Sequence, residues 1–203
     1  MSIYDINIKS VDGEDNFLNQ FKGKVSLIVN VTGDCGNAPQ YGVLETIYRK
    51  YKDQGFEIIA VPTNDFCGVG LTYGEHAYGT DGAPEAKQFA QDEFNVTYQF
   101  TEMVESNPAE ANLIPGLPSK YGKVTPHELF KQLVNNSDMS LMGGNFEKYL
   151  VNKEGKVVNH YANSHLLNYN YDSYVKGSDR DPGIPADEAY ANICKDIEAA
   201  IAA

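Results

Sequence analysis

The sequence of 203 residues contains no tryptophan and only two arginines, Arg49 and Arg180. Its 16 lysines and arginines stand against 28 aspartates and glutamates, which gives a net charge of −12. An acidic surface of this kind repels phosphate backbones and anionic lipid headgroups. We therefore expect neither nucleic acid nor a membrane surface among the partners of this protein.

Long apolar runs and a secretion signal are also missing. No stretch approaches the roughly 18 apolar residues of a membrane-spanning helix. The start, MSIYDINIKSVDGEDNF, lacks the basic and apolar regions of a signal peptide. Cys35, Cys67 and Cys194 are odd in number and widely spaced, unlike a secreted disulfide framework. These absences predict a cytoplasmic protein with reduced thiols.

Length and composition favour one domain over residues 1–203. The chain is 42% hydrophobic and 22% charged, which is typical of a globular protein. Its length allows one substantial core but is too short to expect two.

The first half of the sequence predicts an α/β fold. KVSLIVNV (24–31) and FEIIAVP (56–62) are apolar, largely β-branched runs typical of buried strands. Residues 39–54 between them have apolar side chains at helical spacing, with Pro39 near the start and Gly55 after the end. A strand, a helix and a strand in this order predict a right-handed unit with parallel strands.

The other segments complete a thioredoxin-like fold, with a central mixed sheet flanked by helices. Its further expected elements are an N-terminal strand or hairpin beginning at 3–8, a helix at 84–94, a strand at 96–103, a helix at 126–136, a hairpin at 146–161 and a last helix at 186–203. Residues 63–83 and 106–124 are expected to be two long loop insertions. Loops of this length are more often functional than incidental.

Cys35 follows the first buried strand directly, in the turn that leads to the helix. Sites in open α/β sheets form at the carboxyl ends of strands, and the free N–H groups at a helix start stabilise a thiolate. The neighbouring Asp34 acts against the thiolate. Since free cysteines are also among the most buried residues, position alone leaves both a reactive and a structural role open.

Two long stretches resemble the glutathione peroxidases. GKVSLIVNVTGDCGNAPQYGVLETIYRKYKDQGFEIIAVPTNDF (23–66) is similar to the first signature of that family, and GNFEKYLVNKEGKVVNHY (144–161) is similar to its WNFEKFLV segment and the following hairpin. PHELFKQL (126–133) is a weaker match to its HPLFKYL. The resemblance implies a thioredoxin fold and an antioxidant enzyme that reduces hydrogen peroxide or organic hydroperoxides with electrons from thiols, without a cofactor.

The resemblance also implies roles for particular residues. Cys35 would be the peroxidatic cysteine, which attacks the peroxide and becomes a sulfenic acid that a second thiol reduces. Three partners surround this residue in the family, an asparagine, a tryptophan and a glutamine. The asparagine maps to Asn145, whereas Gly144 and Val69 replace the tryptophan and the glutamine.

Gln40, near the helix start, is the first candidate to supply a missing hydrogen bond, although a glutamine there is often only a cap or a surface residue. Further candidates lie in the first long loop: Tyr73, Glu75, His76 and Tyr78. For these residues too the alternative is a surface position with no role in the site, because polar loop side chains are usually solvated.

Cys67 is the candidate resolving cysteine. Ala90 occupies the place where thioredoxin-dependent members of the family carry that thiol. Cys67 lies in the loop near the end of the reactive strand and could approach Cys35, but it could equally be an ordinary loop cysteine. Cys194 falls on the apolar face of the last helix and is expected in the core.

The scarcity of arginine bears on the reductant, because glutathione carries carboxylates that such residues would bind. We expect a thioredoxin-like protein or a small thiol instead. The four histidines lack the spacing of metal ligands, so no metal is expected.

Three functions therefore remain open: a hydroperoxide reductase, slow because its site is incomplete; a peroxide-sensing thiol relay; and a non-enzymatic thioredoxin-fold binding protein. Gly144 and Val69 favour the second and third, whereas Cys35, Gln40 and Asn145 favour the first. We expect the reductase.

Overall fold

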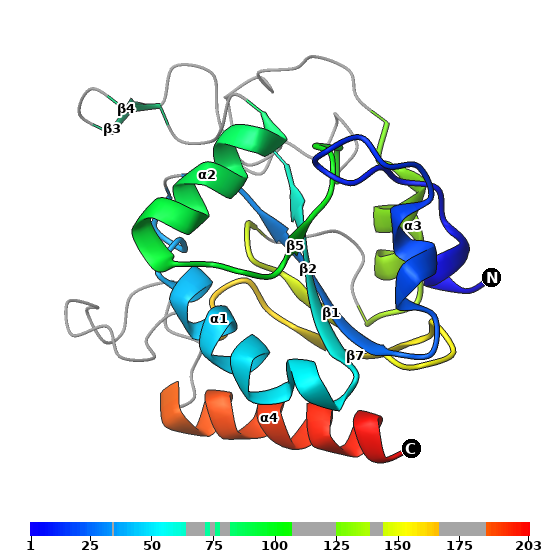
Figure 1. The fold of residues 1–203 in the computed structure, drawn as a ribbon. Helices are drawn as coiled ribbons and strands as arrows, with labels where there is room; N and C mark the ends of the chain where they lie inside the picture. Colours follow the sequence, from blue (N-terminus) through cyan, green and yellow to red (C-terminus); the bar gives the residue numbers. More distant parts are fainter. Residues whose placement is uncertain are drawn as a thin grey trace.

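A computed structural model describes residues 1–33, 35–63, 82–106, 125–138, 144–166 and 186–203, and the backbone of 72–73 and 76–77. Its α-helices and strands are, in chain order, β1 (Val25–Val31), α1 (Gln40–Tyr51), β2 (Phe56–Pro62), β3 (Thr72–Tyr73), β4 (His76–Ala77), α2 (Ala83–Phe94), β5 (Gln99–Phe100), α3 (Glu128–Asn135), β6 (Lys148–Val151), β7 (Val157–Tyr161) and α4 (Ala186–Ala202). Three short 3₁₀ helices add η1 (Ile3–Asp5), η2 (Phe17–Phe21) and η3 (Lys52–Gln54). Figure 1 shows them around one twisted sheet.

That sheet has five strands in the order β5-β2-β1-β6-β7. β1 and β2 pair in parallel from Val25 opposite Phe56 to Val31 opposite Pro62, and every residue of both strands is buried. β6 pairs antiparallel with β1 and with β7, so the sheet is mixed. The predicted parallel unit and antiparallel hairpin are both confirmed.

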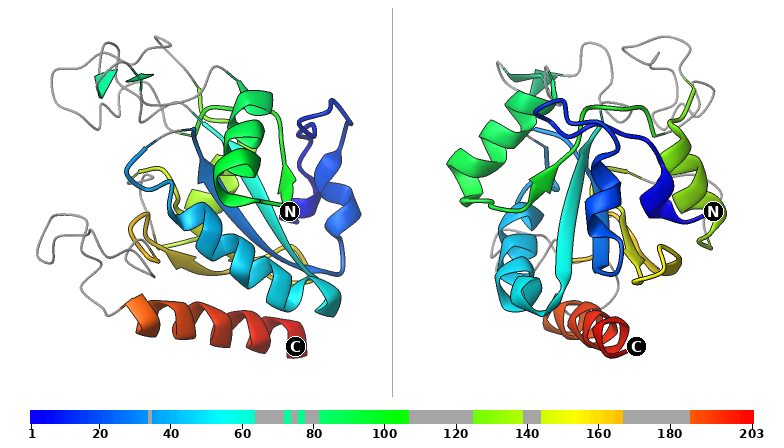
Figure 2. Two further views of the ribbon diagram at one scale, coloured as in Figure 1. Left: turned by 60° about the vertical axis from the view of Figure 1, so that its left-hand side comes forward. Right: turned by 45° about the vertical axis from the view of Figure 1, so that its right-hand side comes forward.

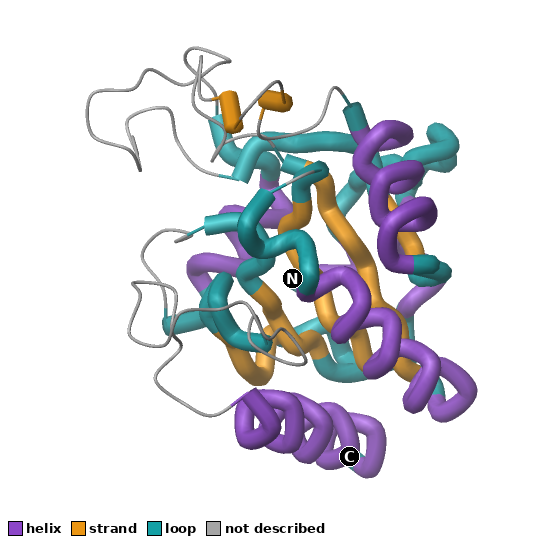
Figure 3. The backbone as a smooth tube through the Cα atoms, turned by 90° about the vertical axis from the view of Figure 1, so that its left-hand side faces the viewer, coloured by secondary structure: helices purple, strands orange, loops and turns teal. Residues whose placement is uncertain are grey.

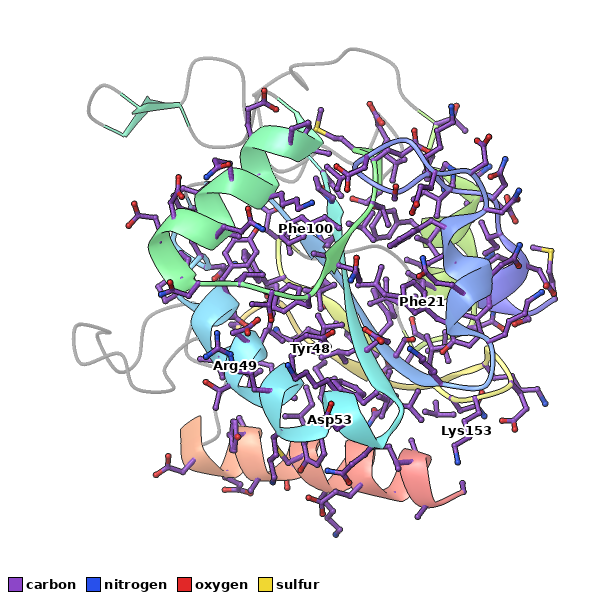
Figure 4. All side chains as sticks on the ribbon, viewed as in Figure 1. Phe21, Tyr48, Arg49, Asp53, Phe100 and Lys153 are labelled. Atoms are coloured by element: carbon purple, nitrogen blue, oxygen red, sulfur yellow. The ribbon has the colours of Figure 1, made fainter. Side chains whose placement is uncertain are left out.

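Helices cover both faces of the sheet and bury two apolar clusters. α1 and α4 cover one face (Figures 1 and 3), where the cluster includes the alternate β1 residues Val25, Leu27, Val29 and Val31. The N-terminal segment and α3 cover the other face, against Ile28 and Ile59 (Figure 2). In Figure 4 Tyr48 and Phe100 lie on the α1 side and Phe21 on the opposite side. This alternation follows from the two-residue period of a strand.

α1 forms where the apolar spacing predicts it. The residues expected on one face are all buried: Tyr41, Leu44, Ile47, Tyr48 and Tyr51. Pro39 precedes the first helical residue, and the chain leaves through η3 to Gly55, whose φ of 81° a glycine adopts without strain. The helix therefore starts at the end of β1 that carries Cys35.

The later elements agree with expectation as well. α2, α3 and α4 occupy the predicted segments, and Gly155, with φ 75°, lies in the turn between β6 and β7. The expected strand at 96–103 is much shorter, since only Gln99 and Phe100 pair in parallel with β2. No helix in the described residues is long and apolar enough to span a bilayer.

The expected N-terminal hairpin is wrong as a strand ladder. Ile3–Asp5 and Phe17–Phe21 are 3₁₀ turns, and the extended chain between them makes a single bridge, Ser10 to Thr101. Ile3, Ile6 and Ile8 are all buried against η2 and α3. The segment follows the curved edge of this apolar cluster, and the partner strand beside it is too short to extend the pairing.

Candidate active site

Cys35 lies where β1 gives way to α1, as the sequence predicts. Two turns follow Cys35. They are closed by hydrogen bonds from Ala38 N to Cys35 O at 2.9 Å and from Gln40 N to Asn37 O at 3.1 Å. Cys35 is partly buried and packs on the apolar cluster beneath α1. The cysteine is thus neither in the protein interior nor on an open surface, which suits a thiol that must meet a small substrate.

Tyr41 is the aromatic neighbour of this turn. It is fully buried, its hydroxyl donates to Thr32 O at 2.6 Å, and its ring packs edge-on against Phe146 with centroids 4.9 Å apart. Burial raises the pKa of Tyr41 well above 10, and the charge of the Cys35 thiolate raises it further. The hydroxyl therefore stays a neutral donor to Thr32 O, and this bond fixes the backbone just ahead of Cys35.

Asn145 reaches the site through a segment fastened to the end of β1. Asn30 is fully buried, donates from Nδ2 to Gly144 O at 3.1 Å and accepts from Glu147 N at 2.8 Å through Oδ1. Phe146 N also donates to Asn30 O at 2.7 Å. One side chain of β1 thereby holds the backbone on both sides of Asn145, which is itself 7% exposed.

Asn37 joins the two halves of the site. Its Nδ2 donates to Asn145 O at 3.0 Å, which ties the turn of Cys35 to the Asn145 segment. The structure therefore places the turn that carries Cys35 beside the backbone of Asn145. Asn37 was missed from the sequence, although an amide two residues after the cysteine was the available signal.

Gln40 is the first residue of α1 and is fully buried. Its Nε2 donates to Asn163 O at 2.7 Å. The Asn163 side chain in turn lies against Gly144, where a Cβ would stand 2.3 Å from Asn163 Nδ2. We call Asn37, Gln40, Asn145 and Asn163 the amide cluster. No local sequence pattern marked Asn163, because the segment after β7 meets the turn of Gln40 only in the fold.

Several predicted site residues lie outside the described part of the chain: Cys67, Val69, Asp34, Glu75 and Tyr78. Tyr73 and His76 have a described backbone only, in the two-stranded β3–β4 pair. Cys194 is buried in the core on α4, as expected. Among the described residues no group of three histidine, cysteine or carboxylate side chains is placed to hold a metal.

A model of the glutathione peroxidase family matches residues 3–114. This chain belongs to the glutathione peroxidase family. The resemblance seen in the sequence is therefore confirmed.

Two curated relatives match most of this chain. The chloroplastic phospholipid hydroperoxide glutathione peroxidase 1 of Arabidopsis thaliana is 37% identical over 166 residues, which are 79% of this chain and 59% of the relative. The chain thus spans little more than half the length of that relative. The glutathione peroxidase-like peroxiredoxin 2 of Saccharomyces cerevisiae is 34% identical over 161 residues, covering 79% of this chain and 87% of the relative.

The solved structures show the fold. The crystal structure of T. cruzi GPX1 matches with a TM-score of 0.58 at 20% identity, covering 100% of this chain and 97% of that one. The predicted thioredoxin-like fold is confirmed.

Proposed function

We propose that this chain reduces hydrogen peroxide or organic hydroperoxides with electrons from thiols, and that Cys35 is its peroxidatic residue. The observation that carries the proposal is the place of Cys35, partly buried at the carboxyl end of β1 and tied through Asn37 to Asn145. Relatives named as phospholipid hydroperoxide glutathione peroxidase and glutathione peroxidase-like peroxiredoxin support the same class of reaction.

The proposed reaction has two halves. The Cys35 thiolate attacks the terminal oxygen of the hydroperoxide, the O–O bond breaks, and that oxygen remains on sulfur as a sulfenic acid. The leaving oxygen takes a proton and departs as water or an alcohol. A thiol then attacks the sulfenic acid, releasing water and forming a disulfide, and a second thiolate reduces that disulfide and restores Cys35. We propose that the side chains of Asn145 and Gln40 form hydrogen bonds in this site.

We propose a thioredoxin-like protein or a small thiol as the reductant, and Cys67 as the resolving thiol. The net charge of −12 argues against a pocket dedicated to the carboxylates of glutathione. We also propose one domain and a reducing compartment such as the cytoplasm, which suits three cysteines in no paired framework.

Peptide-mapped mass spectrometry tests the role of Cys35. The fully reduced protein receives one equivalent of hydrogen peroxide at neutral pH, with dimedone present to trap a sulfenic acid. We expect rapid modification of Cys35 or a Cys35–Cys67 disulfide, and neither product in Cys35→Ser. Cys194→Ser is the matched control and should react like the wild type, because Cys194 is buried. An unmodified Cys35 after long exposure would overturn the proposal.

A peroxide-sensing thiol relay is the second candidate, favoured by Gly144 in place of the family's tryptophan. Turnover separates the two. A reductase consumes many equivalents of peroxide when a thioredoxin system or a small thiol is supplied. A relay instead stops after one oxidation of Cys35 until its partner is added.

A further inference from the structure

Two amides beside Cys35 have side-chain orientations fixed by the fold. Asn37 Nδ2 faces Asn145 O at 3.0 Å, and Gln40 Nε2 faces Asn163 O at 2.7 Å. A backbone carbonyl can only accept a hydrogen bond, so in both amides the nitrogen must be the atom facing it. The usual ambiguity between the oxygen and the nitrogen of an amide is therefore removed.

The oxygens of the same two amides are buried and lack a partner. Asn37 Oδ1 and Gln40 Oε1 have no hydrogen-bond partner among the described residues, and neither does Asn145 Oδ1. Buried polar atoms in native proteins nearly always have a partner. Three orphaned acceptors in one cluster therefore indicate a place built for a molecule that donates hydrogen bonds.

The chemistry of these acceptor oxygens limits the class of molecule that can bind them. Thr63 Oγ1 and Tyr98 Oη, the other unpartnered buried side-chain oxygens in the described part of the chain, are hydroxyls that carry a hydrogen themselves. An amide oxygen has none, so its ligand must bring an O–H or N–H group. Carbonyl oxygens also repel anions, so the ligand is a neutral or cationic molecule with an O–H or N–H group, a class that includes hydroperoxides.

The position of the amides relates this ligand to Cys35. Asn37 and Gln40 follow the cysteine within one continuous run of turns, closed by Ala38 N to Cys35 O and Gln40 N to Asn37 O. A ligand held by these oxygens therefore lies by the turn that carries Cys35.

We propose that Gln40 Oε1 and Asn37 Oδ1 accept hydrogen bonds from the terminal O–H of the hydroperoxide that Cys35 attacks. This inference rests on the proposed function and gives it a means of substrate recognition. The O–H lies on the oxygen transferred to sulfur, and it stays on that oxygen in the sulfenic acid. Because every hydroperoxide carries this group, the amides select the class of substrate rather than its organic substituent.

Two reagents separate substrate binding from thiol reactivity. Stopped-flow rates of Cys35 oxidation by hydrogen peroxide are compared with rates of Cys35 modification by methyl methanethiosulfonate, an electrophile that has no hydrogen-bond donor. The variants are Gln40→Met and, as a second site, Asn37→Leu. Gln54→Met is the matched control, because Gln54 Nε2 also donates to a backbone carbonyl, Lys50 O at 3.1 Å, but Gln54 is exposed in η3, beyond the far end of α1.

We expect Gln40→Met and Asn37→Leu to slow the peroxide reaction at least tenfold while the methanethiosulfonate rate changes less than twofold. Gln54→Met should leave both rates unchanged. Equal slowing with both reagents, or a peroxide rate like the wild type's, would overturn the inference. A wild-type Cys35 that does not react with peroxide at all would overturn the proposed function instead, so the two failures are distinguishable.

Discussion

Asn163 occupies the space in which a side chain at position 144 would begin. A Cβ built on Gly144 stands 2.3 Å from Asn163 Nδ2 and 3.1 Å from its Cγ. The resemblance implies a tryptophan in the family where this chain has Gly144, and here a polar side chain from the segment after β7 lies in that space. Since Asn163 O also accepts a hydrogen bond from Gln40, Asn163 belongs to the amide cluster as well as filling the space beside Gly144.

Substitution of Gly144 tests this packing. Gly144→Ala should lower the free energy of unfolding by about 0.5–1 kcal/mol, because the new methyl group meets the end of the Asn163 side chain, which must move aside. In Asn163→Gly the same substitution should cost much less, and the double-mutant cycle should give a coupling above about 0.5 kcal/mol. Urea unfolding of the four proteins measures it. Additive costs would show that Asn163 does not occupy this space in solution.

The element that closes the α1 face is α4, which is held at several points. Its buried face consists of Ala189, Ile193, Cys194, Ile197 and Ala200. Polar contacts add orientation: Asp196 accepts from Asn159 Nδ2 and from the Tyr161 hydroxyl, both at 2.7 Å. At the end of the helix Lys153 Nζ donates to Ile201 O at 2.6 Å, which satisfies one of the free terminal carbonyls.

Asp196 therefore anchors α4 to β7. Asp196→Ala should lower the free energy of unfolding by about 1–2 kcal/mol, since two donors lose their acceptor. The neighbouring Lys195→Ala, at an exposed position of the same helix, should change it by less than about 0.5 kcal/mol. Chemical denaturation compares the two variants. Equal effects would mean that the apolar face alone holds α4.

At the scale of the whole molecule, a buried lysine joins the sheet to the site. Lys148 is fully buried, and its Nζ donates to Phe146 O at 2.6 Å and to Ala162 O at 3.3 Å. These carbonyls immediately adjoin Asn145 and Asn163, so Lys148 supports two segments of the amide cluster. Burial lowers the pKa of Lys148 from 10.5 to about 7, although the charge of Glu147 acts in the opposite direction.

The stability of the fold should depend on pH through Lys148. Between pH 7 and 10.5 the unfolded chain holds the Lys148 proton and the folded chain releases it, so stability rises with pH in this window. The free energy of unfolding of the wild type relative to Lys148→Met should rise by about 2 kcal/mol between about pH 7 and pH 9. Urea titrations at both pH values measure the difference. A difference independent of pH would contradict the lowered pKa.

Much of the fold could be predicted from local patterns. The continuous apolar runs of β1 and β2, the helical spacing of α1 and the turn at Gly155 each act within a few residues of the chain. The family signatures then placed Cys35 and Asn145 in one site. The N-terminal segment was predicted wrongly, because its alternating residues pack around the edge of a cluster that forms only from distant parts of the chain.

The sequence by itself determined the order of the elements, the position of Cys35 at a strand end and the family. Only the tertiary structure decided how the amides of the site are paired: Asn37 with Asn145, Gln40 with Asn163, and Asn163 over Gly144. The physical reason is the separation along the sequence over which each interaction acts. Strand and helix patterns repeat over two to four residues, whereas the hydrogen bonds of Asn37 and Gln40 join residues more than a hundred positions apart, and the fold alone brings them together.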